Sequence, residues 1–492
     1  MRRAIRWCLV LLVCAWTLVW CGCQGLTAGT ANPNPGPQNV QAINHIILMA
    51  QENRSFDHYF GALPAYWAAN GFPPQQFDGL PQFSTSGGTT PSNPGCDPNF
   101  PFDPTSGTIQ DCVFDQSNPV PSFHMISACV EDPSPSWNES HVDWNFANQT
   151  GGVSTTYVGN GFVWTAAHDA RNNQPPFFDT IGKRAMGYYD SSDLPYYYFM
   201  ASNFATSDRW FSPAMANTQV NRMYMLAATS HGHVYPLTAG SAQLTDKTIF
   251  ELLDENNITW KDYVVDPNPT ALQGSAFDQF AYSGSHSQNV VPISEYMTDV
   301  ANGTLPSVAI IDPGYSNGLD EHGVSSDVSP GGSVQVGSQY VSTLINALMT
   351  SSSWKDSVFI LTYDEFGGFY DHVPPQPMPP PDSFTPSDLQ LGDICSSSTS
   401  PSTCHFDYTG YRIPLIVVSP FTKKNYVSHT VADYTAVLKL IETRFNLPSL
   451  TARDAAQPDM TEFFDFVNVP WATPPPPPTQ PVTAPCYVDM VP

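Results

Sequence analysis

Residues 43–57 read Ile-Asn-His-Ile-Ile-Leu-Met-Ala-Gln-Glu-Asn-Arg-Ser-Phe-Asp, and this stretch sets the expectation for the fold. The run from Ile43 to Ala50 is mostly apolar, which is typical of a short strand buried on both faces. Polar side chains from Gln51 to Asp57 would stand at the carboxyl end of that strand. Ligands bind beyond the carboxyl ends of strands in an open parallel sheet, so this segment predicts one wall of a site.

Similar apolar runs occur at 307–311, 357–363 and 413–419, and helical patterns lie notably at 339–349 and 432–445. This alternation predicts an α/β fold whose mostly parallel sheet carries helices on both faces. Segments 70–120 and 374–410 are rich in Pro, Ser, Gly and Cys, and we expect them to form a lid or rim.

Acidic and amide side chains follow two of these predicted strands. Glu52 and Asn53 follow the first run, and Asp364 and Glu365 follow the run at 357–363. Oxygen donors from two strand ends suit a hard divalent cation. Asp and Asn are also common turn and cap residues, and either pair alone would be interpreted in that way. Because both pairs occur in one chain, we expect them to share a metal site.

Two further segments are candidates for chemistry. Thr218 would become a nucleophile if a metal ion lowered the pKa of its hydroxyl or a base took its proton. Asn221 and Arg222 would contact a phosphoryl group. The alternative is that Thr218 caps a helix. In Asp320-Glu321-His322, the histidine would protonate a leaving alkoxide, although spacing alone favours an exposed turn.

The composition indicates an acidic, loop-rich globular protein. The 492 residues include 48 Pro, 32 Gly and 41% hydrophobic residues, enough for one large α/β domain or two domains. With 18 Lys+Arg against 44 Asp+Glu, the net charge is -26, so neither nucleic acid nor anionic lipid head groups are expected as bulk partners. A phosphate ester would need a metal ion or local cations to offset this field.

The amino terminus predicts export. Basic residues precede an apolar run at 8–19 that is too short to span a membrane comfortably. The run ends on a sequence that resembles a bacterial lipobox with Cys23 as a possible lipid anchor, and plain signal-peptidase cleavage is the alternative. We expect a signal peptide at 1–22, a flexible tether at 23–42, a catalytic domain at 43–467 and a Pro-rich tail at 468–492. The protein would be periplasmic, anchored to the outer membrane or secreted by a bacterium.

An even number of cysteines follows Cys23, which favours three disulfides with fifteen possible connectivities. Short loops favour pairing Cys96 with Cys112 and Cys395 with Cys404. No CxxC pair occurs among these cysteines, so a zinc-thiolate site is not expected.

Residues 52–61 read Glu-Asn-Arg-Ser-Phe-Asp-His-Tyr-Phe-Gly, and this run resembles the opening signature of a phosphoesterase family. That family holds bacterial phosphatidylcholine-hydrolysing phospholipases C and related acid phosphatases. Further similar motifs follow in the family's order, including Thr-Tyr-Asp-Glu at 362–365 and Phe-Tyr-Asp-His-Val-Pro at 369–374. The resemblance extends over about residues 43–467.

The resemblance implies an alkaline-phosphatase-like three-layer sandwich with long loop insertions, and one divalent metal ion (Ca, Mg, Mn or Zn). Thr218 would be the nucleophile that forms a phosphothreonine intermediate, and His322 the general acid. Asn221 and Arg222 match the residues that follow the nucleophile. The metal ligands implied by the resemblance are Glu52, Asn53, Thr218, Asp364 and Glu365.

The chain departs from the family's pattern at two places. Pro135 stands where many members have a histidine, so either His141 replaces it or one phosphate contact is lost. Phe366 replaces a histidine often found after the Asp-Glu pair. Asp320 and His372 are further candidates for phosphate contacts.

The expected activity is therefore hydrolysis of phosphate esters, with phospholipid head-group diesters cleaved in the manner of a phospholipase C. An acid phosphatase acting on monoesters is the first alternative. A non-catalytic surface lipoprotein that keeps the fold as a binding module is the second, and the intact set of candidate ligands argues against it.

Overall fold

The computed structural model describes residues 38–105, 110–131, 133–238, 240–265, 275–323, 332–396 and 405–491. The predicted signal peptide, the candidate lipid anchor Cys23, most of the tether and Cys404 lie outside these residues.

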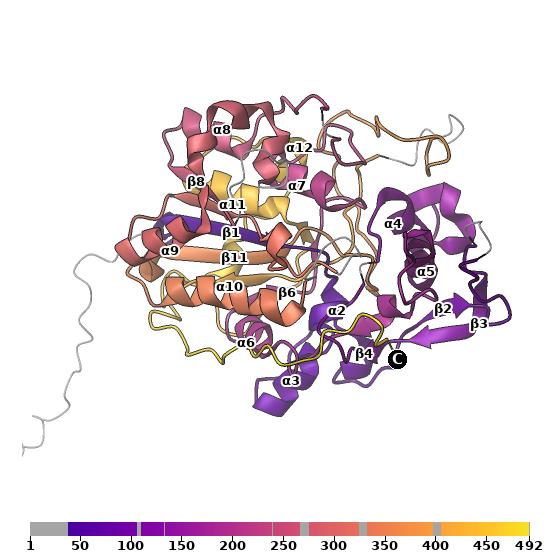
Figure 1. Ribbon diagram of the computed structural model, residues 1–492. Coiled ribbons are helices and arrows are strands. Elements are labelled where there is room, and N and C mark those ends of the chain that lie inside the picture. The colour runs from indigo at the N-terminus through magenta and orange to yellow at the C-terminus, as the bar shows by residue number, and fades with distance from the viewer. Residues whose placement is uncertain are drawn as a thin grey trace, which may run out of the picture.

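One large sheet forms the centre of the molecule, which confirms the predicted α/β class (Figure 1). Its strands lie in the order β13-β6-β12-β11-β1-β10-β8-β9. β12 is antiparallel to both neighbours, and all other neighbours are parallel. In chain order the strands are β1 (His45–Gln51), β6 (Ala205–Ser207), β8 (Trp260–Val264), β9 (Val290–Pro292), β10 (Val308–Ile311), β11 (Ser357–Tyr363), β12 (Ile416–Val418) and β13 (Tyr426–Ser428).

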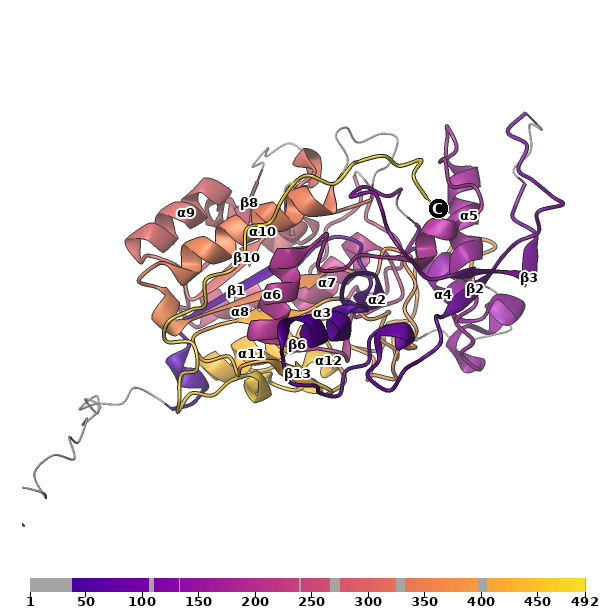
Figure 2. The ribbon, with the colours of Figure 1, turned by 90° about the horizontal axis from the view of Figure 1, so that it is seen from below.

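Helices cover both faces of the sheet and make it the middle of three layers (Figures 1 and 2). One layer contains α3 (Leu63–Asn70), α6 (Pro195–Asn203), α9 (Ile293–Asn302) and α10 (Val334–Met349). The other contains α7 (Thr218–Ala227), α8 (Ile249–Glu255), α11 (Thr435–Phe445) and α12 (Ala452–Ala455). Because both faces are covered, the central strands carry continuous apolar runs. The helix predicted at 432–445 is shorter, since its first residues form the small strand β14 (Ala432–Asp433), which pairs with β7 (Trp210–Phe211).

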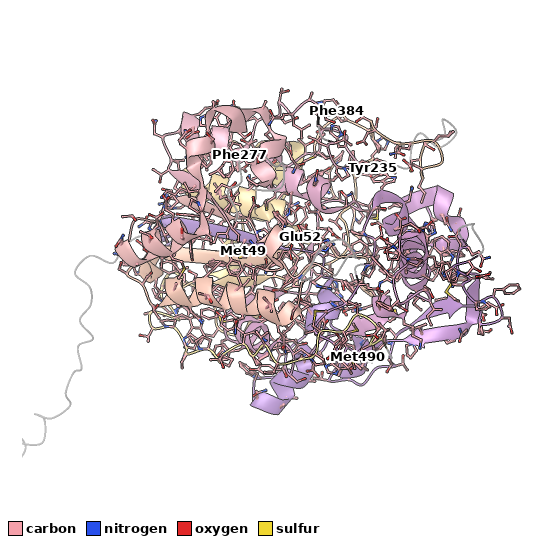
Figure 3. All side chains as sticks on the ribbon, viewed as in Figure 1. Met49, Glu52, Tyr235, Phe277, Phe384 and Met490 are labelled. Atoms are coloured by element: carbon pink, nitrogen blue, oxygen red, sulfur yellow. A yellow bond between two sulfur atoms is a disulfide. The ribbon has the colours of Figure 1, made fainter. Side chains whose placement is uncertain are left out.

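The register of β1 and β11 positions the candidate site. The two strands pair from His45 opposite Ser357 to Gln51 opposite Tyr363, so both end at the same level. The residues after them therefore enter the same edge of the sheet. Figure 3 shows Glu52 at this edge, beyond Met49 of β1.

A smaller lobe lies beyond that edge (Figure 1). It contains α4 (Trp137–Trp144), α5 (Phe162–Asn172) and the antiparallel pair β2 (Ser92–Cys96) and β3 (Phe114–Pro121). This pair lies almost entirely within the segment 70–120, which is predicted to form a lid or rim. The predicted Cys96–Cys112 disulfide is confirmed and holds the two strands together. Two short parallel strands, β4 (Phe123–His124) and β5 (Gly187–Tyr188), join the lobe to the body.

The chain after residue 467 runs along α6 and α10 (the yellow segment in Figures 1 and 2). Gln480 is buried there and donates to the carbonyl of Asp193 at 2.8 Å. A second disulfide joins Cys129 to Cys486. Cys395 is disulfide-bonded as well, and its predicted partner lies outside the described residues. Among the described residues, no helix combines the length and apolarity needed to cross a bilayer.

Candidate active site

Thr218 is the first residue of α7, and its hydroxyl faces the end of β1. Thr218 Oγ1 donates to Asn53 Oδ1 at 3.4 Å. Asn217 is the cap residue of the helix, so the hydroxyl of Thr218 is directed at Asn53 and not at the helix backbone. The structure therefore does not support the alternative that Thr218 is a cap.

The two predicted ligand pairs meet across β1 and β11. The amide of Asn53 donates to Asp364 Oδ1 at 3.1 Å, and the amide of Asp364 donates to the carbonyl of Gln51 at 3.0 Å. The amide of Arg54 donates to the carbonyl of Glu365 at 3.1 Å. Glu52, Asn53, Asp364 and Glu365 are all at most 4% exposed. Three separate stretches of chain, counting α7, thus converge on one buried spot.

A glycine permits this close approach. Gly367 has a φ of +68°, and a Cβ added there would lie 2.3 Å from the carbonyl oxygen of Asn53. The amide of Gly367 donates to Glu365 Oε2 at 2.6 Å, which orients that carboxylate. Both the backbone conformation and the space require glycine at this position.

Arg222 lies among carboxylates from three strand ends. Its Nη2 is 3.2 Å from Glu52 Oε1, its Nε is 3.4 Å from Asp364 Oδ2, and its Nη1 is 3.7 Å from Asp312 Oδ1. These distances favour a role for Arg222 in pairing with carboxylates, because each side of the guanidinium already faces one. Its predicted contact with phosphate stays a prediction.

Asn221 supports the turn before the nucleophile. Its side chain accepts from the amide of Ala214 at 3.0 Å and donates to the carbonyl of Ala216 at 2.6 Å. Asn221 is fully buried and its side chain already bonds to the backbone. Its predicted contact with a phosphoryl group therefore stays a prediction.

Asp312 is a residue of this cluster that the sequence analysis missed. It follows β10, the neighbour of β1, as Glu52 follows β1. The signal was present, since the predicted strand at 307–311 ends directly before an aspartate. Asp312 is 1% exposed, and its Oδ2 accepts from the amide of Ala276 at 2.9 Å.

Burial strongly influences the charges of this cluster. It raises the pKa of Glu52 well above its usual range, and the neighbouring charge of Asp364 adds to this effect. Burial also raises the pKa values of Asp364 and Asp312, against the opposing effect of Arg222. A bound cation would favour the ionised form of each carboxylate.

His322 reaches the same edge. Its Nε2 lies 3.7 Å from Glu52 Oε2, and its backbone amide donates to Asp320 Oδ1 at 3.1 Å. The imidazole is 31% exposed, so it borders both the buried cluster and solvent. This position is compatible with proton donation to a leaving group. No contact joins Asp320 to Thr218 among the described residues.

Glu321 is held by a tyrosine cage, consisting of Tyr59, Tyr197 and Tyr363. Their hydroxyls donate to the Glu321 carboxylate at 2.6, 2.5 and 2.8 Å, and Gln51 Nε2 donates at 3.2 Å. Glu321 is fully buried and has a φ of +66°, a left-handed conformation that costs a non-glycine residue about 1–2 kcal/mol. The cage offsets that cost and fixes the backbone on which His322 stands.

Two predicted histidines lie apart from this cluster. His141 is buried on α4, where Nδ1 lies 2.6 Å from the carbonyl of Trp137, and burial lowers its pKa to about 4. His372 lies between two carboxylates, with Nδ1 2.6 Å from Asp57 and Nε2 3.0 Å from Asp78. No contact within the described ranges joins either histidine to Thr218, so their phosphate contacts stay predictions.

Two other acidic groups are more compact than the cluster at the strand ends. Possible ligand atoms lie within 4.8 Å of one another in Asp57–Asp371–His372 and in His124–Asp190–Asp193. In the first group Arg412 already pairs with both carboxylates, at 3.1 and 2.9 Å. The side chains of the second group are partly exposed. Neither group lies in contact with Thr218.

The cluster at the strand ends fits a hard divalent cation better. Its donors are carboxylate oxygens, the amide oxygen of Asn53 and the hydroxyl of Thr218, which suit such an ion. Asp364 Oδ2 is buried and accepts no hydrogen bond from any described residue. The guanidinium of Arg222 lies close to two of these carboxylates, 3.2 Å from Glu52 Oε1 and 3.4 Å from Asp364 Oδ2.

Comparisons with known proteins identify the family of the chain. The Phosphoesterase family matches residues 43–448. Phospholipase C B of Mycobacterium tuberculosis (strain ATCC 25618 / H37Rv) is 30% identical over 473 residues, which cover 89% of this chain and 80% of that protein. Non-specific phospholipase C6 of Arabidopsis thaliana is 29% identical over 427 residues, 84% of this chain and 70% of that one. Among solved structures, a protein in the alkaline phosphatase superfamily from Vibrio parahaemolyticus aligns with a TM-score of 0.33 and 13% identity, over 54% of this chain and 64% of that chain.

Proposed function

The chain belongs to the phosphoesterase family and hydrolyses phosphoric esters, and on this premise we propose that it cleaves the phosphodiesters of phospholipid head groups. The relatives named phospholipase C support a diester substrate. The observation that carries the proposal is the approach of the Thr218 hydroxyl to Asn53 within 3.4 Å, at an edge lined with carboxylates.

In this proposal, Thr218 is the nucleophile. A divalent cation held by Glu52, Asn53, Thr218, Asp364 and Glu365 would supply positive charge that lowers the pKa of the threonine hydroxyl. The Thr218 hydroxyl loses its proton to water as Oγ1 attacks phosphorus, and the bond from phosphorus to the leaving alkoxide breaks. His322 donates its proton to that alkoxide. Water then attacks the phosphothreonine, releases the phosphorylated head group and restores Thr218.

We also propose export. The predicted amino-terminal signal lies outside the described residues, but disulfides support an oxidising compartment, since they rarely persist in the cytosol. The Cys96–Cys112 and Cys129–Cys486 bridges are of this kind. A lipid anchor at Cys23 belongs to the same proposal.

Isosteric variants test the nucleophile. Thr218→Val keeps the shape but lacks the hydroxyl, and turnover of p-nitrophenylphosphorylcholine should fall at least about a thousand-fold. Thr218→Ser should keep part of the activity. Thr298→Val, on the exposed side of α9, is the matched control and should equal the parent. If the Thr218→Val variant were as active as the parent, Thr218 would not be the nucleophile and the proposed mechanism would be wrong.

The substrate class needs a second comparison. Faster turnover of p-nitrophenyl phosphate than of p-nitrophenylphosphorylcholine would replace the proposed phosphodiesterase by an acid phosphatase. A folded parent that turns over neither ester in the presence of Ca²⁺, Mg²⁺, Mn²⁺ or Zn²⁺ would favour the binding module.

A further inference from the structure

Arg222 is the only cation in direct contact with the carboxylates at the ends of β1, β10 and β11 among the described arginines and lysines. Those carboxylates belong to Glu52, Asp312 and Asp364, and all are at most 4% exposed. Without a countercharge, three buried carboxylates facing one another would be strongly unfavourable. The guanidinium supplies that countercharge from α7.

The side chain has little freedom to serve a substrate. It is 2% exposed, its Nη2 also donates to the carbonyl of Ala50 at 3.1 Å, and its guanidinium lies 5.1 Å from the ring centre of Tyr315. A phosphate contact would require Arg222 to leave at least one buried carboxylate without its partner.

The guanidinium neutralises the charge of the surrounding carboxylates, but it is poorly placed to form hydrogen bonds with two of them. Within the described part of the chain, Arg222 Nε and Nη1 donate no hydrogen bond, and Asp312 Oδ1 and Asp364 Oδ2 accept none, although all these atoms are buried. Their separations of 3.4 and 3.7 Å are longer than a good hydrogen bond. A compact ion with carboxylate ligands on several sides would satisfy the same oxygens.

We propose that Arg222 occupies the position of a second divalent cation and so limits this edge of the sheet to one ion. Glu52, Asp364 and Asp312 surround the guanidinium there, at 3.2, 3.4 and 3.7 Å. This inference rests on the proposed function in one respect: the first ion is the one that the proposed mechanism places at Asn53, Thr218 and their neighbours. Its own claim is that removing Arg222 opens a site lined by Glu52, Asp312 and Asp364.

Metal stoichiometry tests the proposal without any activity measurement. The full-length parent and the Arg222→Met variant are equilibrated with Mn²⁺, dialysed and analysed for bound metal per chain. The variant should bind one ion more than the parent. Arg222→Lys keeps the positive charge and should match the parent. The double variant Arg222→Met/Asp312→Asn lacks one carboxylate of the new site and should also return to the parent's count.

The comparison remains decisive if other parts of the interpretation fail. A parent that binds no Mn²⁺ would contradict the proposed metal dependence, yet a gain of one ion by Arg222→Met would still support this inference. An unchanged or lower count in Arg222→Met would overturn it. If Arg222→Met and Arg222→Gln fold only with Mn²⁺ present, the ion replaces the guanidinium as proposed; if neither folds at any Mn²⁺ concentration, the proposal is wrong.

Discussion

Replacing Tyr197 by phenylalanine removes one oxygen atom and one of the hydrogen bonds to the Glu321 carboxylate. Its neighbour on α6, Tyr196, provides a matched control. Both tyrosines are at most 1% exposed, but Tyr196 donates to the neutral amide oxygen of Asn346, at 3.0 Å. Burial raises the pKa of Glu321, and the hydrogen bonds from the tyrosine cage oppose this effect. If Glu321 is ionised at pH 8, the two variants lose the same atom and differ mainly in the charge of the acceptor.

The expected magnitudes follow from that difference. A hydrogen bond to a charged group contributes about 1.5–3 kcal/mol, and a bond between neutral groups about 0.5–1.5 kcal/mol. Tyr197→Phe should therefore lower the free energy of unfolding by about 1–1.5 kcal/mol more than Tyr196→Phe. Guanidinium chloride unfolding at pH 8, with the disulfides intact and the Trp fluorescence recorded, measures both. Equal losses would mean that Glu321 is protonated in its cage and would refute this reasoning.

A second assay connects the cage to catalysis. Because Glu321 precedes His322, a loosened cage should misplace the proposed general acid. Tyr197→Phe should then slow the hydrolysis of esters with a poor alkoxide leaving group more than the hydrolysis of p-nitrophenyl esters. The p-nitrophenolate leaving group needs little protonation. A purely structural cage would slow both kinds of ester equally.

Three other perturbations have definite expected results. Gly367→Ala should weaken Mn²⁺ binding at least about ten-fold in isothermal titration because its Cβ meets Asn53, whereas Gly71→Ala, at a φ of +74° with open space around it, should leave Mn²⁺ binding unchanged. The carboxylates beside His372 raise its pKa to about 10 despite burial, so its stabilisation is complete below about pH 6.5 and is lost as the pH rises towards 10. Between pH 7 and 9 the parent should therefore lose about 1 kcal/mol per pH unit more than His372→Gln in urea unfolding. Chelation with EDTA should abolish turnover and lower the melting temperature, and added divalent cation should restore both.

The central strands were predictable because a strand buried on both faces of a sheet has a continuous apolar sequence. The apolar runs that became β1, β10 and β11 are long and continuous, and parallel strands end at one edge. Short strands such as β6, with three residues, lack any such signal. The reversed direction of β12 depends on packing between segments far apart in the chain and cannot be inferred from its own residues.

The candidate site was predictable up to the positions of its side chains. Strand ends bring Glu52 and Asp364 together whatever else the chain does. The partners of Arg222 were not predictable, because an arginine one turn into a helix serves a phosphate or a carboxylate equally well by residue type. Tyr59 and Tyr197 of the tyrosine cage lie more than a hundred positions from Glu321, so no local sequence pattern predicts these contacts.

The Cys129–Cys486 bridge spans 357 positions, so most of the polypeptide lies inside one covalent ring. During synthesis from the amino end, Cys129 emerges long before its partner, and this ring closes among the last steps of maturation. A chain interrupted before residue 486 keeps an odd thiol that is open to exchange with the wrong cysteine. Carboxypeptidases that trim the finished protein, by contrast, should stop at Cys486, because the crosslink retains that residue.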